Sequence, residues 1–232
     1  MKTEPRQLVL DLAHRSALDL EDFLVSASNQ AAIDLIDGQL NWPNGAALVV
    51  GPRGAGKSHL ANVWRMKTEA RLLSAPEADE TLVLDAAHSG AVVVEDLDQG
   101  ARDEAALFHL LNIARQGKAL ALFTSCRAPG DLEIALPDLR SRIKALPMAL
   151  IAPPDEALLQ AVLVKLFTDR QLTVEPGVIS FMMMRMERSM AAANRIVAEI
   201  DKLGLAMRRK VTKQLVQQAL EIMENRPQEA EK

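Results

Sequence analysis

The segment from Gly51 to Ser58, GPRGAGKS, constrains the fold of this chain more than any other. It satisfies the pattern G-x-x-x-x-G-K-[ST] of a phosphate-binding loop, which needs a buried strand before it and a helix after it. An apolar run from Ala46 to Val50 precedes the loop, and a helix-like stretch from His59 to Lys67 follows it. Glycines let the backbone N–H groups point at phosphate oxygens at the positive end of a helix. The segment therefore predicts a site for a nucleoside triphosphate or diphosphate.

The residues of this loop have separate expected roles. The Lys57 ammonium would reach the β- and γ-phosphates, and the Ser58 hydroxyl would hold Mg²⁺. An ordinary glycine-rich turn between a strand and a helix is the alternative interpretation. The nucleotide-binding residues predicted here are Gly51, Pro52, Arg53, Gly54, Ala55, Gly56, Lys57, Ser58 and His59.

The alternation of apolar runs and helix-like segments predicts the fold of the first part of the chain. The apolar runs contain few polar residues, as strands covered on both faces do. Their alternation with helices predicts a doubly wound α/β domain with a five-stranded, mostly parallel sheet. The predicted strands are Ala47–Val50, Arg71–Leu73, Ala91–Val94, Ala119–Phe123 and Leu146–Ile151, and the predicted helices are His59–Lys67, Glu77–Ala87, Glu104–Gln116 and Asp131–Lys144.

The pattern becomes purely helical after Pro153 and Pro154. Asp155 is typical of the N-cap of a helix through Asp169, and Pro176 begins another helix. We therefore expect a small all-helical second domain. The predicted divisions are an N-terminal segment (1–18), an α/β nucleotide-binding domain (19–152), a helical domain (153–225) and a disordered tail (226–232).

Composition excludes several classes of protein. Only 3% of the 232 residues are aromatic, which argues against a base-stacking surface for single-stranded nucleic acid. A net charge of −4 provides no global field that attracts DNA or an acidic membrane. The single cysteine excludes an internal disulfide and fits a reducing cytoplasm. Since there is neither a signal-peptide pattern nor an apolar run long enough to span a bilayer, we expect a cytoplasmic protein without a membrane partner.

Two carboxylates follow the third predicted strand, in the sequence AVVVED from Ala91 to Asp96. At the C-terminal edge of a parallel sheet, beside a phosphate-binding loop, carboxylates hold Mg²⁺ or its waters and orient the attacking water. Glu95 occupies the metal position and Asp96 the position of the catalytic base, whereas many such ATPases place aspartate first. Because a displacement of about 1 Å at a catalytic group can cost roughly a hundredfold in rate, we expect slow intrinsic hydrolysis.

The loop after the fourth predicted strand, Thr124-Ser125-Cys126-Arg127, suits a sensor of the γ-phosphate. Ser125 can donate a hydrogen bond, whereas the Cys126 thiol is a poor donor. A small buried thiol is the alternative interpretation of Cys126.

Two arginines, Arg140 and Arg142, precede the fifth predicted strand. They are either surface charges or groups that project into the nucleotide site of a neighbouring subunit. An arginine finger of that kind stabilises the charge that develops on the transferred phosphoryl group.

The N-terminal sequence QLVLDL alternates with a period of two residues. It predicts either a short edge strand or a linear motif that binds an apolar pocket of a partner. In the second interpretation, Gln7 provides a polar anchor and leucines Leu8, Leu10 and Leu12 provide the apolar contacts.

Residues 6–225 resemble the AAA+ ATPases of the DnaA group. The segments that carry the resemblance are, in order along the chain, SNQAA (Ser28 to Ala32), GPRGAGKS, VVVEDLD, FTSCRAP, LRSRI and RKVT (Arg209 to Thr212). Within that group the chain is most similar to the regulatory inactivators of DnaA. The resemblance implies an AAA+ base domain and a helical lid, with ADP or ATP at their junction and Asn29 near the adenine. Members of this group carry a second-sensor arginine where this chain has Ala191. Arg188 and Arg195 flank that position by about one helical turn, so they are either candidates for the second sensor or solvated surface arginines.

The same resemblance implies partners. Arg142 would be the arginine finger, supplied in trans to ATP bound by DnaA. QLVLDL would bind the DNA polymerase sliding clamp, so that DNA is reached only through the clamp. The implied function is negative regulation of replication initiation. Two alternatives stay open, a self-oligomerising AAA+ loader or motor and a nucleotide-gated adaptor without a catalytic contribution.

Overall fold

The computed structural model describes residues 24–207 and 211–225. They form two compact units: the first comprises Ala27–Pro154, and the second comprises the described residues from Asp155 onward together with residues 24–26. Each unit is described by itself. The predicted partner-binding residues Gln7, Leu8, Leu10 and Leu12 lie outside the described residues. No helix within the described ranges is long and apolar enough to cross a membrane.

The first unit contains a five-stranded sheet with the order β2-β3-β4-β1-β5. All of its neighbouring strands are parallel, as the apolar runs predict. Strands β1, β3 and β4 are buried because helices cover both faces. The strands are β1 (Ala46–Val50), β2 (Arg71–Ser74), β3 (Ala91–Glu95), β4 (Leu120–Ser125) and β5 (Met148–Leu150).

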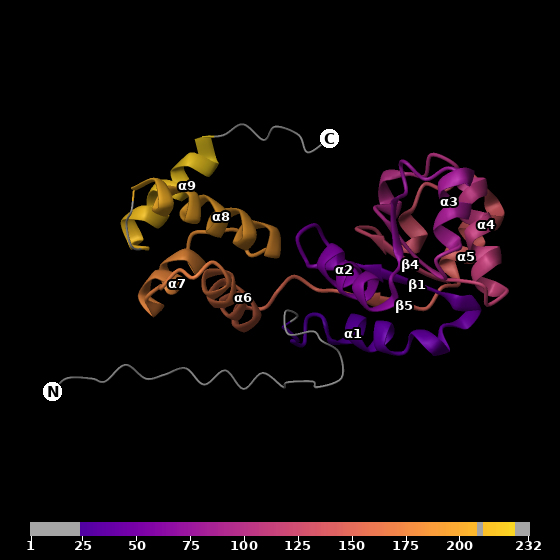
Figure 1. Ribbon diagram of the computed structural model, residues 1–232, viewed down its shortest axis with the longest axis horizontal. Helices are drawn as coiled ribbons and strands as arrows, with labels where there is room; N and C mark the ends of the chain where they lie inside the picture. Colours follow the sequence, from indigo (N-terminus) through magenta and orange to yellow (C-terminus); the bar gives the residue numbers. More distant parts are fainter. Residues whose placement is uncertain (1–23, 208–210, 226–232) are drawn as a thin grey trace. The chain divides into compact units, whose positions relative to one another are not determined.

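The helices of this unit form two layers around the sheet (Figure 1). Buried residues of α3, α4 and α5 pack on one face, against Leu48, Val92 and Phe123. Helices α1 and α2 contact β5, β3 and β4 and provide the second layer. The helices are α1 (Gln30–Asp37), α2 (Lys57–Thr68), α3 (Glu80–Ala87), α4 (Glu104–Arg115) and α5 (Pro137–Lys144), with short 3₁₀ turns at Gln39–Asn41, Pro43–Gly45, Leu97–Gln99 and Pro129–Asp131.

Helix α5 begins later than the sequence predicts. The expectation of a helix from Asp131 to Lys144 is wrong in its first part, because Asp131 ends a 3₁₀ turn and α5 begins at Pro137. Leu136 has an extended backbone, with φ −71° and ψ 111°. A residue before proline is held away from the helical region by contact with the proline ring, whereas proline itself suits the first helical position.

Both edges of the sheet carry features that discourage further strand pairing. At one edge, β5 has three residues, and its Met148 and Leu150 side chains are 44% and 59% exposed. Pro147 lies directly before this strand. At the other edge, β2 begins with the exposed Arg71. Short edge strands, charged side chains and nearby prolines all blunt the row of unpaired backbone groups that an edge presents.

Both tryptophans of the chain lie in the first unit and stack on each other. Trp42 and Trp64 have ring centroids 5.5 Å apart and an interplanar angle of 26°. The Trp42 indole donates to the Leu35 carbonyl at 2.7 Å, and the Trp64 indole donates to the Gln39 side chain. The pair ties the 3₁₀ turns before β1 to helix α2, so its fluorescence reports on this unit.

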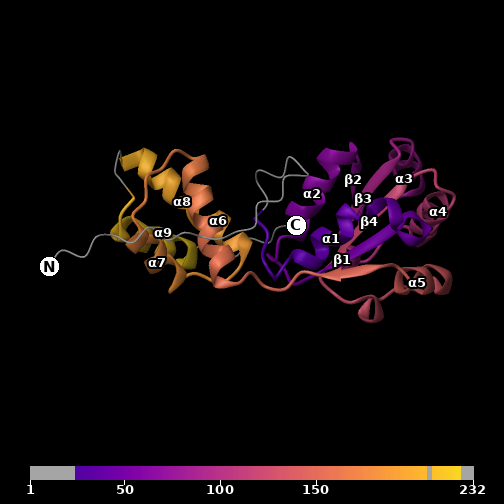
Figure 2. The ribbon, with the colours of Figure 1, turned by 90° about the horizontal axis from the view of Figure 1, so that it is seen from below.

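The second unit is all-helical, as predicted (Figure 2). Its core contains the fully buried Leu163, Phe167, Met182 and Ile200. Asp155 caps the first helix by accepting a hydrogen bond from the Leu158 N–H at 2.7 Å. The helices are α6 (Glu156–Asp169), α7 (Pro176–Met183), α8 (Met190–Met207) and α9 (Lys213–Asn225).

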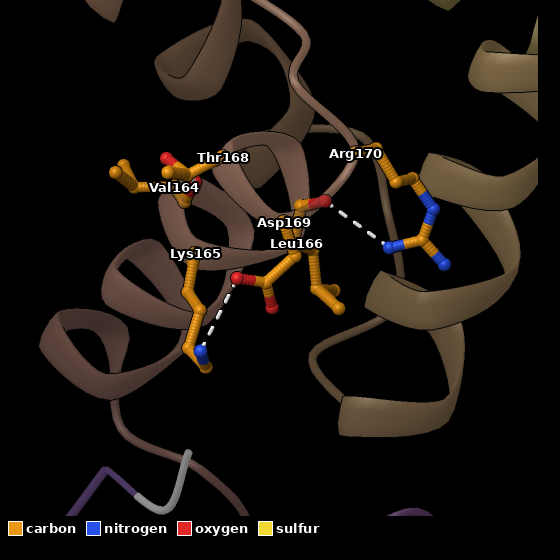
Figure 3. A network of polar contacts seen from close by, with 6 residues as sticks. All are labelled: Val164, Lys165, Leu166, Thr168, Asp169 and Arg170. Carbon is orange, nitrogen blue, oxygen red and sulfur yellow. Dashed lines mark hydrogen bonds and ion pairs between the residues drawn. The ribbon is translucent and has the colours of Figure 1, made fainter. Parts of the chain in front are cut away.

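Polar contacts close the end of α6 (Figure 3). Lys165 forms an ion pair with Asp169 at 3.3 Å, and Arg170 donates to the Leu166 carbonyl at 3.1 Å. Arg170 also lies 3.9 Å from the Asp201 carboxylate of α8. Since cations near a helix C-terminus interact favourably with its exposed carbonyls, Arg170 both ends α6 and links it to α8.

Candidate nucleotide-binding site

The loop between β1 and α2 has the backbone that a phosphate cradle needs. Gly54 and Gly56 have φ of 74° and 104°, which is the left-handed region that favours glycine. A Cβ atom added to Gly51 would lie 2.6 Å from the Ile151 carbonyl oxygen, so only glycine fits this close approach to the chain after β5. The loop leads directly into the N-terminus of α2, where free N–H groups and the helix dipole favour an anion.

Lys57, at the first position of α2, is 8% exposed. Its ammonium donates to the Gly51 carbonyl at 2.7 Å and to the Pro52 carbonyl at 3.1 Å. It also lies 3.2 Å from the Cys126 sulfur, which belongs to the loop after β4. These contacts hold the charge at the loop, while Ser58 and His59 are exposed beside it.

The two carboxylates after β3 have different surroundings. The Oε1 atom of Glu95 is buried and has no hydrogen-bond partner among the described residues. Asp96 has a left-handed backbone with φ 58°, and its N–H donates to the Thr124 hydroxyl at 3.4 Å. An unpaired buried carboxylate oxygen carries a desolvation cost unless a cation or an ordered water binds it.

The loop after β4 uses its polar groups internally. The Ser125 hydroxyl donates to the Arg127 carbonyl at 2.7 Å and accepts from the Arg127 N–H at 3.0 Å. Its single proton is thus engaged in this turn, and a contact with a phosphate would require that hydrogen bond to break. Cys126 is half-buried, and its N–H donates to Asp98 at 2.6 Å.

Strand order brings these groups to one end of the sheet. Because β4 lies between β1 and β3, the loops after β1, β3 and β4 are neighbours at the carboxyl ends of parallel strands, where open α/β sheets bind ligands. The left-handed glycines, the Lys57 ammonium and the orphaned Glu95 oxygen fit a Mg²⁺–nucleotide. No group of three or more His, Cys, Asp or Glu side chains that could hold a metal ion occurs in residues 24–207 and 211–225.

Two further residues take part in the site through contacts that the sequence did not predict. Thr124 is 1% exposed and binds the backbone of Asp96, and Asp98 holds the backbone of Cys126. Thr124 stands inside the quoted FTSCRAP segment, so its place at the end of a buried strand was an available signal. Asp98 likewise stands inside the VVVEDLD segment, but nothing in that segment indicates its contact with Cys126, which spans 28 residues.

Comparison with known proteins shows which folds this chain resembles. Residues 155–220 match the family model described as the lid domain of Hda. Domain III of the replication initiation protein DnaA from Thermotoga maritima superimposes with a TM-score of 0.72 and 16% identity, covering 89% of this chain and 96% of that one. Residues 155–220 thus resemble the Hda lid domain, and the chain as a whole has the fold of DnaA domain III.

Two other solved structures share this fold. AMPPCP-bound DnaA from Aquifex aeolicus has a TM-score of 0.67 and 16% identity, covering 88% of this chain and 69% of that one. The Holliday junction branch migration motor RuvB from Thermotoga maritima has a TM-score of 0.63 and 14% identity, covering 84% of this chain and 67% of that one. The predicted fold, an AAA+ α/β base and a helical lid, is therefore confirmed.

Near the expected adenine position, Asn29 is 3% exposed and directly precedes α1. The adjacent Ser28 carbonyl accepts a hydrogen bond from the Ala152 N–H at 2.9 Å, which ties this segment to the end of β5. Asn29 thus lies against the sheet rather than in solvent. Its contact with a nucleotide base stays a prediction.

Arg142 lies in the last turn of α5. Its guanidinium carbon lies 4.7 Å from the centre of the Phe108 ring on α4, a cation–π arrangement. Within the described ranges, no carboxylate forms an ion pair with Arg142. The Arg142 side chain therefore packs on the Phe108 ring, while its N–H donors form no ion pair with a carboxylate of the described residues. Arg140, on the same helix, is exposed.

The two candidate arginines of the lid are both exposed and both paired. Arg188 lies 3.9 Å from Glu156, and Arg195 lies 3.8 Å from Glu187. Exposed pairs of this kind contribute little to stability and exchange partners readily. Either arginine is therefore free to change partner, and the choice between them as second sensor stays open.

Proposed function

We propose that this protein is a negative regulator of replication initiation that stimulates hydrolysis of DnaA-bound ATP. The observation that carries the proposal is the match of residues 155–220 to the Hda lid model, on a chain whose whole fold resembles DnaA domain III. Arg142 supports it, because this arginine is positioned by a ring face and paired with no carboxylate of the described chain.

The proposed resident ligand is ADP or ATP with Mg²⁺. Two DnaA structures with this fold are described as bound to AMPPCP. In this chain the backbone from Gly51 to Gly56 and the Lys57 ammonium would bind the phosphates, and Asn29 would contact the adenine. Ser58 and Glu95 would hold Mg²⁺, which neutralises phosphate charge when bound. A bound nucleotide would then act mainly as a conformational cofactor.

The proposed chemistry takes place in the nucleotide site of the partner. Arg142 would lie against the phosphates of DnaA-bound ATP and stabilise the charge that develops during phosphoryl transfer, an effect worth about 10³–10⁵ in rate. Intrinsic hydrolysis is expected to be weak. Glu95 precedes Asp96 in the reversed order, and Asp96 would have to act as the base from a shorter side chain.

The proposed docking site is on the DNA polymerase sliding clamp. Residues Gln7, Leu8, Leu10 and Leu12 would bind an apolar pocket of the clamp, with glutamine as the polar anchor. DNA would be reached only through the clamp, which agrees with a net charge of −4. The site of action would be the cytoplasm.

The test is hydrolysis of ATP on preloaded DnaA, measured with and without DNA-loaded clamp. We expect stimulation that depends on the clamp and falls at least about 10³-fold in Arg142→Ala. The matched control is Arg140→Ala, which removes the same charge from an exposed position of the same helix. Equal loss in both variants, or no loss in Arg142→Ala, would rule out the finger assignment.

The same assay separates the two alternatives. A self-oligomerising loader or motor would hydrolyse its own ATP without DnaA, and Arg142→Ala would abolish that turnover. A nucleotide-gated adaptor would bind clamp and DnaA, but no arginine substitution would alter hydrolysis.

A further inference from the structure

Helix α5, which carries Arg142, begins without a cap of its own. The N-cap residue is Leu136, and its side chain makes no capping hydrogen bond. A helix start leaves backbone N–H groups without partners inside the helix, and a nearby Ser, Thr, Asp or Asn normally satisfies one of them. Here the proline at position 137 removes one N–H, while the N–H groups of Ala135 and Leu136 still need acceptors.

A carboxylate from another helix supplies both acceptors. Glu104, in the first turn of α4, accepts from the Ala135 N–H through Oε1 at 2.9 Å and from the Leu136 N–H through Oε2 at 2.6 Å. These contacts span 31 and 32 residues. Charge-assisted hydrogen bonds are shorter and stronger than neutral ones, and a bidentate pair also fixes orientation. The negative charge of Glu104 also interacts favourably with the helix dipoles, because it lies at the N-terminal ends of both α4 and α5.

The same face of α4 contacts α5 a second time. Phe108 is one helical turn beyond Glu104, and its ring lies under the Arg142 guanidinium at 4.7 Å. Arg142 is six positions after Leu136, or about 9 Å along the helix axis. Glu104 therefore fixes the start of α5, and the Phe108 ring contacts the Arg142 side chain near the end of that helix. Two points of attachment determine both the axial position and the rotation of a helix of eight residues.

We propose that Glu104 is a positioning residue for Arg142. By binding the two N–H groups before α5, its carboxylate sets the place from which Arg142 reaches the partner's phosphates. This inference rests on the proposed function. Loss of the carboxylate moves the guanidinium away from its productive position, while the nucleotide site of this chain, at the carboxyl ends of β1, β3 and β4, is unaffected.

The test compares Glu104→Gln and Glu104→Ala with a matched control, Glu80→Gln. Glu80 has the same first-turn position on α3, so the control removes the same charge from a helix start. Glutamine keeps one acceptor but turns an NH₂ group toward the second N–H. Stimulated hydrolysis of DnaA-bound ATP is measured against DnaA concentration, and the amount of active protein is taken from the stoichiometry of ADP binding.

We expect kcat per nucleotide-binding molecule to fall roughly tenfold in Glu104→Gln and toward a hundredfold in Glu104→Ala, the cost of a misplacement of about 1 Å. The KM for DnaA should stay unchanged, and Glu80→Gln should behave as wild type. Amide hydrogen exchange across residues 138–144 should accelerate in both Glu104 variants, a readout that needs no DnaA.

Several results would overturn the inference. An unchanged kcat would do so, as would a rise in KM alone, which would make Glu104 a contact residue. A fall in ADP stoichiometry that accounts for the whole loss of activity would show a merely structural role. If Arg142→Ala loses stimulation while Glu104→Ala keeps it, only this inference fails. If Arg142→Ala keeps stimulation, the finger assignment fails and this inference fails with it.

Discussion

Replacing Gly51 by alanine tests whether close packing between the chain after β5 and the start of the phosphate loop fixes that loop. The added Cβ would lie 2.6 Å from the Ile151 carbonyl oxygen and 3.2 Å from the Ile151 Cβ. Carbon and oxygen normally approach to about 3.3–3.6 Å, so the backbone would have to separate by roughly 0.7 Å or more. The Gly51 N–H, bonded to the Ser125 carbonyl at 3.1 Å, resists that movement.

Overpacking of this kind costs about 1–3 kcal/mol. The upper half of this range applies, because the clashing atom is the backbone oxygen of Ile151 and the Gly51 N–H is itself held by a backbone hydrogen bond. For a domain of this size, that loss corresponds to a fall in Tm of roughly 5–10 °C. Nucleotide binding should weaken as well, since the Gly51 carbonyl is the acceptor for Lys57 at 2.7 Å.

The assay is urea unfolding followed by tryptophan fluorescence. Trp42 and Trp64 both lie in the base domain, so the signal reports on this domain. The matched control is Gly130→Ala, where an added Cβ meets no atom within 4 Å. That control should be neutral or stabilised by up to about 1 kcal/mol, because alanine restricts the unfolded chain. Free energies of unfolding for the two variants that agree within about 0.5 kcal/mol would refute the close-approach argument.

Three further substitutions or modifications have clear expected results. Glu95→Gln should weaken ADP binding in the presence of Mg²⁺ while leaving metal-free binding and the free energy of unfolding nearly unchanged, as titration calorimetry would show. Phe167→Ala should destabilise the lid by about 3–5 kcal/mol, because its ring is fully buried, and circular dichroism should detect this loss while tryptophan fluorescence does not. Maleimide labelling of Cys126, the single cysteine, should slow in saturating ADP, because its sulfur lies 3.2 Å from Lys57; equal rates would argue against phosphates beside that lysine.

The local features of this molecule could be predicted from its sequence. The strands and the loop from Gly51 to Ser58 depend on apolar runs and glycine positions, which are visible within a few residues. Asp155 as the cap of α6 is a feature of the same kind. In each case the sequence signal lies within a few neighbouring residues.

The features that escaped prediction depend on contacts between distant segments. The late start of α5 accompanies an extended Leu136 whose N–H binds Glu104, 32 residues earlier. The contact between Lys57 and the Cys126 sulfur spans 69 residues. The orphaned oxygen of Glu95 reflects the burial of one atom. No periodicity or propensity reports such pairings, because they exist only once the sheet order has been set.

The blunted edges of the sheet limit how this protein can recognise another. Since β5 is three residues long and β2 begins with an arginine, neither edge offers a long, regular ladder of main-chain groups to a partner strand. Recognition by the base domain therefore relies on side chains that helices and loops display. Such an interface is sensitive to ionic strength and can be retuned one substitution at a time. Partner choice can diverge among descendants of this fold while the sheet beneath stays the same.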